Sequence, residues 1–220
     1  MNKSVYSLVL MDDVIDAIDR MACAEGTSRS SLINRILAQY VNLTTPEMRM
    51  KDIFSSMQQL IHDSLQLQFM PSDSMISIRS PLRYKYKPTI RYGLELYRSP
   101  GDYLGRLRVS FRTQNSSLLY IFEQCINLWV SLEQYYLKDN LSAPIRYELS
   151  DGRFTREILR PRTAGALSEA ELGRLIADYV NLLDSMIKLY FEYAGDPPVA
   201  AAKVRDAYVD YLSDENFPLL

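Results

Sequence analysis

The chain opens with a strict alternation of residue types and then changes to helical spacing. The alternation over residues 4–10 predicts a short β-strand whose two faces differ. One face carries Tyr6, Leu8 and Leu10, and the other carries Val5, Ser7 and Val9. Because backbone polar groups need hydrogen-bond partners, and this short unit offers no second strand, we expect the strand to pair with a second copy of the chain.

Two short helices follow the strand. The first is predicted from about Asp12 to Gly26, because glycine favours the left-handed conformation that ends a helix. The second begins at Ser28, whose side chain can cap the free amides of a helix. Their apolar positions recur at helical spacing: Val14, Ala17, Ile18, Met21 and Ala22, then Leu32, Ile33, Ile36, Leu37 and Tyr40.

Another helix is predicted over residues 45–66. Thr45 and Pro46 are typical of a helix start, since threonine caps the amides and proline suits the first helical position. Its apolar positions are Met50, Ile53, Phe54, Met57, Ile61 and Leu65. We therefore expect residues 45–70 to be a connecting helix, followed by a boundary near Pro71.

From Met75 onward the apolar residues recur at every second position, which predicts β-structure. Apolar and cationic positions alternate over residues 75–80, 84–96 and 106–112, so three strands are predicted there. A hairpin is predicted over residues 145–159, and its turn falls at Asp151 and Gly152.

Long amphipathic helices complete the second domain. They are predicted over residues 116–137, 168–193 and 199–212. Strands that are apolar on one face only predict an antiparallel sheet whose apolar face is covered by helices. The expected fold class is therefore α+β, with a small unit over residues 1–44 and a domain of unknown role over residues 71–220.

The N-terminal unit resembles the ribbon-helix-helix DNA-binding family of the CopG, Arc and MetJ type. The resemblance rests on the order strand, helix, helix and on two segments, Leu10-Met11-Asp12-Asp13-Val14 and Gly26-Thr27-Ser28-Arg29-Ser30-Ser31-Leu32-Ile33. In this family two chains pair their strands into an antiparallel ribbon that enters the major groove, and their helices form a shared core. The resemblance thus implies a dimerisation and DNA-binding unit over residues 1–44.

The resemblance also implies a role for each residue of this unit. Tyr6, Leu8 and Leu10 would lie in the dimer core. The residues that would face the bases are Val5, Ser7 and Val9, and those that would bind phosphate are Lys3, Ser28, Arg29 and Ser30. The implied partners are double-stranded DNA and a second copy of the chain, in a homodimer.

The base-facing positions depart from the usual family pattern, which places hydrogen-bonding side chains there. Valine can contact a thymine methyl group, but it cannot hydrogen-bond to a guanine edge as arginine does. Residues 1–45 also hold four basic against five acidic side chains, although phosphate attraction dominates protein–DNA affinity. We therefore expect weak binding or strong dependence on thymine contacts, and a unit that only dimerises is the alternative.

The predicted strands of the second domain carry a cationic face. Residues 79–112 contain nine lysines and arginines against two acids, whereas residues 163–220 contain four against ten. The candidate residues for an anion or nucleic-acid face are Arg83, Lys85, Lys87, Arg91, Arg106, Arg108 and Arg112. The second domain could bind a small anionic effector or a protein partner, or it could join dimers into a tetramer. Alternatively, the cationic face is a solvated surface that the acidic C-terminal helices neutralise.

Composition argues against several other classes of function. The chain is 47% hydrophobic and 24% charged, which is typical of a soluble globular protein, and it contains no long apolar run or signal-like start. The single histidine, His62, and the absence of a glycine-rich phosphate loop argue against catalytic and metal sites. Cys23 and Cys125 are expected to be buried, reduced thiols. We therefore expect no enzyme activity, no cofactor, no metal and no membrane partner.

The sequence thus predicts a cytoplasmic, nucleoid-associated transcriptional regulator of bacterial type, acting as a repressor. The alternative is a protein-interaction module such as the antitoxin of a toxin–antitoxin pair. Antitoxins with this unit usually have a short, poorly ordered tail. Residues 71–220 are instead long, aromatic and periodic, so the regulator is favoured.

Overall fold

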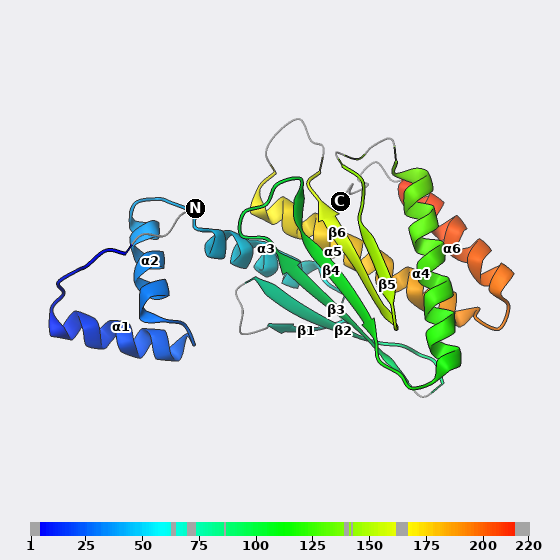
Figure 1. The fold of residues 1–220 in the computed structure, drawn as a ribbon, viewed down its shortest axis with the longest axis horizontal. Helices are drawn as coiled ribbons and strands as arrows, with labels where there is room; N and C mark the ends of the chain where they lie inside the picture. The colour runs from blue at the N-terminus through cyan, green and yellow to red at the C-terminus, as the bar shows by residue number, and fades with distance from the viewer. Residues whose placement is uncertain are drawn as a thin grey trace.

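The computed structural model of the protein describes residues 5–62, 65–69, 74–85, 87–138, 141, 143–161 and 167–213. A small helical unit at the N-terminus is followed by a larger domain built from helices and an antiparallel sheet (Figure 1). The fold class is α+β, as the sequence predicts.

The N-terminal unit consists of α1 (Asp12–Ala24) and α2 (Arg29–Tyr40). Gly26 follows the end of α1 with a φ of 62°, the left-handed conformation that glycine adopts most readily. Residues 5–11 form no regular element, because none of the described strands pairs with them. The predicted strand is therefore not formed within a single chain, and Lys3 lies outside the described residues.

The second domain contains a six-stranded sheet with the order β1-β2-β3-β4-β6-β5, in which all neighbours are antiparallel. Its strands are β1 (Gln66–Phe69), β2 (Met75–Pro81), β3 (Thr89–Leu96), β4 (Tyr103–Phe111), β5 (Tyr147–Ser150) and β6 (Arg153–Leu159). Alternate residues of β3 are buried, namely Ile90, Tyr92, Leu94 and Leu96. The apolar residues of each strand thus gather on one face of the sheet.

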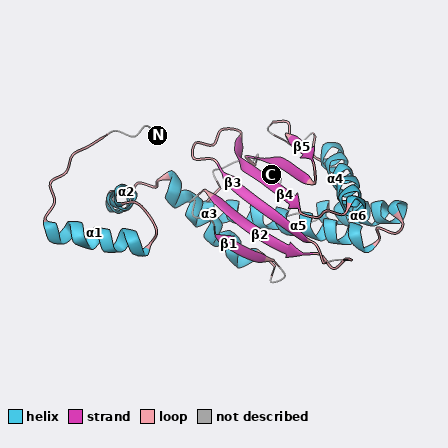
Figure 2. Ribbon diagram, turned by 60° about the horizontal axis from the view of Figure 1, so that its bottom comes forward, coloured by secondary structure: helices cyan, strands magenta, loops and turns pink. Residues whose placement is uncertain are grey.

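Four helices accompany the sheet: α3 (Pro46–Leu60), α4 (Ser116–Tyr136), α5 (Glu169–Glu192) and α6 (Pro197–Leu212). They cover its apolar face, and the opposite face is left open by the described residues (Figure 2). The core between the two layers contains Trp129 and Phe122 of α4, Phe191 of α5 and Phe154 of β6. The long helices over residues 116–137 and 168–193 are therefore correctly predicted to within a residue at each end.

Helix α3 is part of this core, whereas the sequence predicts residues 45–70 as a connecting helix. Met50 and Met57 are completely buried. Gly173 allows α5 to approach α3 closely, because a Cβ there would lie 2.6 Å from the carbonyl oxygen of Ile53. The helix also ends earlier than predicted, and residues 66–69 form strand β1 at the edge of the sheet.

Two further predictions are corrected. Residues 84–85 and 87–88 belong to a loop rather than a strand. Pro88 cannot donate to a strand ladder, and the Leu82 N–H donates to the Pro88 carbonyl across the loop. Cys23 is exposed on α1, because the single chain places nothing over that side of the helix, and only Cys125 is a buried free thiol.

A buried ion pair ties β6 to α4. The Arg156 Nη2 atom lies 3.0 Å from Glu133 Oε1, and both side chains are fully buried. The Tyr179 hydroxyl donates to the same carboxylate at 3.1 Å, and it accepts from the indole N–H of Trp129 at 3.1 Å. The Arg156 guanidinium also lies over the Tyr179 ring. Every polar member of this cluster therefore has a partner in the core.

Glu133→Leu should destabilise the protein, because it leaves the Arg156 charge buried without its partner. The expected loss in the free energy of unfolding, measured by urea denaturation, is about 3–5 kcal/mol. Glu133→Leu combined with Arg156→Met should recover much of that loss. The control Glu123→Leu, on the partly exposed side of α4, should change stability by less than about 0.5 kcal/mol. A Glu133→Leu variant as stable as the control would contradict this account.

Candidate nucleic-acid interface

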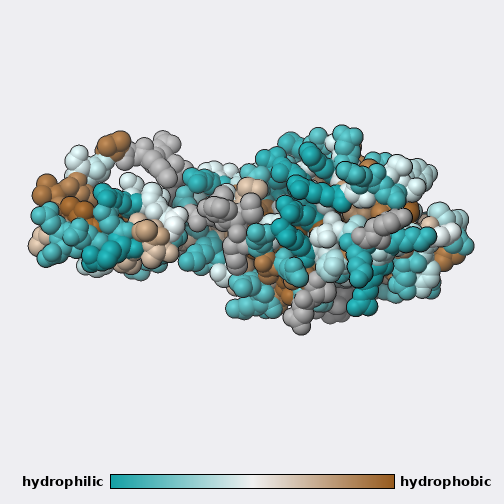
Figure 3. Space-filling view, turned by 90° about the horizontal axis from the view of Figure 1, so that it is seen from below, coloured by the Kyte–Doolittle hydropathy of each residue, from teal (hydrophilic) through white to brown (hydrophobic). Residues whose placement is uncertain are grey.

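The N-terminal unit exposes most of its apolar side chains. Val5, Tyr6 and Val9 are 100%, 86% and 102% exposed, and Leu8 is 53% exposed. Other large apolar residues exposed in this part of the chain are Leu10, Met11, Ile15, Met21, Ile36, Leu37, Tyr40, Val41 and Leu43. Hydrophobic patches are correspondingly visible over this unit in Figure 3.

The same unit has almost no core of its own. Ala22, Leu32 and Ala38 are its only residues, within positions 5–43, that are buried. A contiguous apolar surface of this kind marks an interaction site in a soluble protein. So small a unit also cannot bury enough surface to be stable without a partner. The unit is therefore incomplete as a single chain.

The predicted base-facing residues Val5, Ser7 and Val9 are all exposed, but so are their neighbours in residues 5–10. The single chain therefore does not separate the two faces of this segment. The two faces differ in exposure only when a partner covers one of them, and in the single chain no described residue covers residues 5–10.

The N-terminus of α2 has the local geometry that its sequence predicts. The Ser28 side chain accepts a hydrogen bond from the Ser31 N–H at 3.2 Å and acts as the N-cap. Arg29 and Ser30 follow in the first turn, and both are exposed. The free amides of a helix N-terminus attract anions, so these three residues lie where a phosphate could bind.

Arg29 has a partner that the sequence analysis missed. Its guanidinium forms an ion pair with Asp19 of α1. A second pair of the same spacing joins Arg35 of α2 to Glu25 at the end of α1. Any phosphate at the α2 N-terminus would therefore compete with Asp19 for Arg29. The contact depends on how α1 and α2 cross, so local spacing alone does not reveal it.

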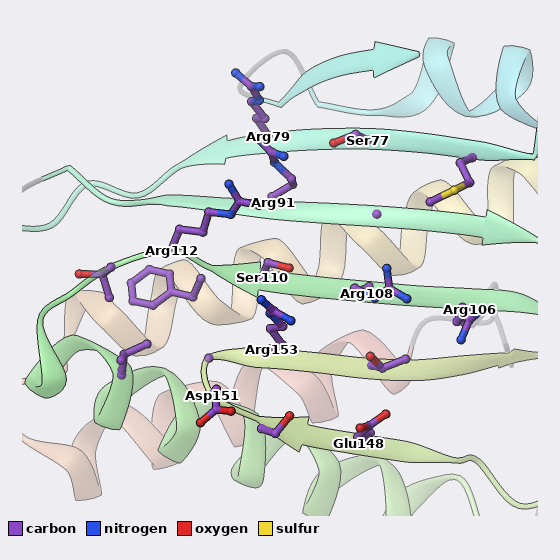
Figure 4. A pocket seen from close by; sticks show the side chains of 18 of the residues that line it. Ser77, Arg79, Arg91, Arg106, Arg108, Ser110, Arg112, Glu148, Asp151 and Arg153 are labelled. Carbon is purple, nitrogen blue, oxygen red and sulfur yellow. The ribbon is translucent and has the colours of Figure 1, made fainter. Parts of the chain in front are cut away.

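The cationic residues of the second domain divide into two groups. Arg91, Arg106 and Arg108 lie on the open face of the sheet, with Arg112 just beyond the end of β4. Arg83, Lys85 and Lys87 lie in the loop between β2 and β3 instead. Figure 4 shows the labelled arginines on the side of the sheet away from the helices.

Two arginines of the open face were missing from the predicted set. Arg79 of β2 lies directly opposite Arg91 in the strand register. Arg153 of β6 lies directly opposite Ser110, which in turn lies opposite Arg91. Alternation in β6 could have identified Arg153, because its neighbour Phe154 faces the core.

At one end of the open face the charged side chains are paired, whereas the other end, with Arg79, Arg91, Arg108 and Arg153, is cationic. Arg106 donates to Glu95 at 2.9 Å, and this hydrogen bond raises the pKa of Arg106. The hydroxyl of Tyr97 donates to Glu157 at 2.7 Å, and burial together with this bond raises the pKa of Tyr97 to about 12. The tyrosine therefore remains a neutral donor at physiological pH.

The acidic C-terminal helices do not neutralise the cationic end. Helix α6 packs against α5 and α4, on the covered side of the sheet. Its Asp206 and Asp210 are exposed, and residues 214–220 lie outside the described part of the chain. Tyr92 of β3 does not join the arginines on this face, since it points into the core and donates to Asp184 at 2.8 Å.

Within the described residues, no group of three or more His, Cys, Asp and Glu side chains is arranged to hold a metal ion. None of the helices in these ranges has the length and apolar character needed to cross a membrane.

Comparison with known proteins identifies the N-terminal unit. Residues 7–44 match the family described as ribbon-helix-helix protein, copG family. No curated protein and no solved structure matches the chain. The N-terminal segment of this protein is therefore a ribbon-helix-helix unit of the copG family, a DNA-binding kind, and the identification covers this segment alone.

Proposed function

We propose that this protein is a transcriptional regulator that binds double-stranded DNA as a homodimer through residues 5–43, and that it acts as a repressor. The observation that carries the proposal is the exposed apolar surface of a segment that matches the ribbon-helix-helix family. A dimer would bury this surface, and a paired ribbon is an element that fits the DNA major groove.

In this proposal the segments 5–10 of two chains pair in antiparallel fashion. Tyr6, Leu8 and Leu10 then face the shared helical core, while Val5, Ser7 and Val9 face the bases. Apolar contact with thymine methyl groups would supply most of the direct readout, because valine has no hydrogen-bonding group in its side chain.

The N-terminus of α2 would position the dimer on the DNA backbone. Its free amides and helix dipole attract phosphate, and Arg29 adds a cation at the same turn. A phosphate that binds Arg29 must first displace Asp19, and this displacement lowers the affinity for DNA. The proposed dimer is therefore a modest binder that relies on two such contacts.

The second domain supports a regulator rather than an antitoxin. Residues 46–213 contribute a sheet and helices with a core of their own. A short toxin-binding tail that orders only on its partner would have no such core.

Leu8→Lys should abolish the dimer, because it places a charge in the shared core. Sedimentation analysis at micromolar concentration should give a dimer for the native chain and a monomer for the variant. Ser7→Lys is the matched control, since it adds the same charge on the face that points away from that core. A native chain that is a folded monomer, or a Leu8→Lys variant that still dimerises, would refute the proposed assembly.

A substitution of Arg29 and a substitution of Asp19 should change the affinity for DNA in opposite directions. Arg29→Ala should weaken binding to every sequence and lower the salt dependence by about one unit per subunit. Asp19→Asn should tighten binding, because it frees Arg29 and removes a negative charge. Fluorescence titration of a duplex selected from a random pool, over a range of salt concentrations, measures both effects.

Arg35→Ala provides the control for this experiment. Arg35 is also paired with an acid, Glu25 at the C-terminal end of α1. It lies six residues further along α2 than Arg29, about 9 Å from the first turn. Its loss should change affinity less than the loss of Arg29. Equal effects for the two arginines, or weaker binding by Asp19→Asn, would contradict the proposed phosphate contact.

A further inference from the structure

A compact group of arginines on the open face of the sheet is separate from the ribbon-helix-helix unit. Arg79, Arg91 and Arg153 lie in one line across the strands, because Arg79 is opposite Arg91, Arg91 is opposite Ser110, and Ser110 is opposite Arg153. Neighbouring strands are about 5 Å apart, so this line spans about 14 Å. Arg108 occupies the next line, between Gly93 and Thr155.

These arginines form no ion pair in the described part of the chain. Arg79, Arg91, Arg108, Arg112 and Arg153 form no ion pair or side-chain hydrogen bond with any described residue. Arg106, by contrast, is held by Glu95 at 2.9 Å. Like charges directly opposite one another in a sheet are destabilising, so the Arg79–Arg91 pair has a cost that a bound anion would remove.

The arginines surround a concavity of about 1110 Å³ (Figure 4). Its floor consists of small residues, namely Ser77, Gly93, Ser110 and Thr155. Ser77 is only 7% exposed, and its hydroxyl has no hydrogen-bond partner. A buried hydroxyl without a partner is costly, and this one lines the concavity beside the arginines. Its oxygen is almost completely covered, so Ser77 forms part of the buried floor and does not reach a ligand.

The lining residues also indicate the size and type of the occupant. The concavity is slightly larger than a typical small-molecule pocket. Phe111 is the only aromatic residue among its described lining residues, and it is 3% exposed. The face therefore lacks the exposed rings on which single-stranded nucleic acids stack their bases.

Two acids at the rim argue further against a continuous nucleic-acid backbone. Glu148 lies on β5 and Asp151 lies in the turn from β5 to β6, and both side chains are exposed at the edge of the concavity. Their carboxylates would repel a chain of phosphates that crossed the whole face. They could instead accept hydrogen bonds from hydroxyl or amino groups of a ligand whose phosphates lie near Arg91.

We propose that the open face of the sheet is a binding site for a small molecule that carries two or more phosphate groups. Arg79, Arg91, Arg108 and Arg153 bind the phosphates, and Glu148 and Asp151 accept from the polar groups at the other end. Arginine suits this role because its planar fork donates to two oxygens at once. The site does not depend on the DNA-binding proposal.

Isothermal titration calorimetry of the full chain in 150 mM salt tests the site with three probes: ATP, inorganic pyrophosphate and inorganic phosphate. ATP and pyrophosphate should bind at one site per chain, and inorganic phosphate should bind at least tenfold more weakly. Arg91→Gln should lower the affinity for ATP about tenfold or more, since a hydrogen bond to a charged group is lost. Arg205→Gln, a loss of the same charge on α6, should leave the affinity unchanged.

Gly93→Val tests the floor of the site without removing charge. A Cβ at Gly93 meets no atom closer than 3.9 Å, where the Arg108 carbonyl oxygen lies, and valine is favoured in strands. The variant should therefore fold, and its melting temperature checks that it does. Its added side chain occupies the floor and should abolish the binding of ATP and pyrophosphate.

Three results would overturn the proposal. One is the absence of binding by both ATP and pyrophosphate. Another is binding that is equally strong in Arg91→Gln, Gly93→Val and the native chain. The third is a single-stranded oligonucleotide that binds this face more tightly than ATP and loses its binding in the same two variants.

Discussion

The N-terminal segment cannot bury its own apolar side chains. In residues 5–43 only Ala22, Leu32 and Ala38 are buried, while Val5, Tyr6 and Val9 are almost completely exposed. The hydrophobic effect favours removal of this surface from water at about 25 cal/mol for each Å² buried. A second copy offers the same surface in a self-complementary arrangement, as twofold symmetry requires. The proposed DNA-binding ribbon and its two proposed phosphate contacts depend on this association.

The second domain differs from the N-terminal segment, because it buries its apolar side chains in a core of its own. One face of its sheet is covered by helices, and the buried Arg156–Glu133 pair joins these layers. On the other face Arg79 and Arg91 lie opposite one another, and neither forms an ion pair with a described residue. Only five residues, 41–45, separate α2 from α3. A dimer of the N-terminal units would therefore hold two such faces close to the DNA.

Much of this architecture could be predicted from periodicity. The helices over residues 116–137 and 168–193 and the strands near Ile76, Leu94 and Val109 follow from apolar spacing, because each element packs one face against the core. Strand β1 was missed because its four residues continue the helical spacing of α3 and are defined only by pairing with β2. The strand over residues 4–10 needs a partner that a single chain does not contain.

The candidate sites were less predictable than the fold. Alternation places Arg91 and Arg108 on the open face correctly, but it cannot tell which cations are neutralised. Arg106 has Glu95 beside it and Arg29 has Asp19, and the latter contact arises only from the packing of α1 against α2. Arg156 has the same charge as Arg153 three residues earlier, yet it is completely buried. Which partner each cation meets is a property of the tertiary structure.

Hydrogen exchange of the backbone amides of residues 5–11, in the full chain at micromolar concentration, tests the central claim most directly. In an antiparallel two-stranded ribbon, alternate amides of each strand bond to the partner and the others point outward. The account therefore predicts slow exchange at every second residue of this segment, with protection that falls as the protein is diluted. Fast exchange at all of these residues, at concentrations where the second domain is protected, would contradict it.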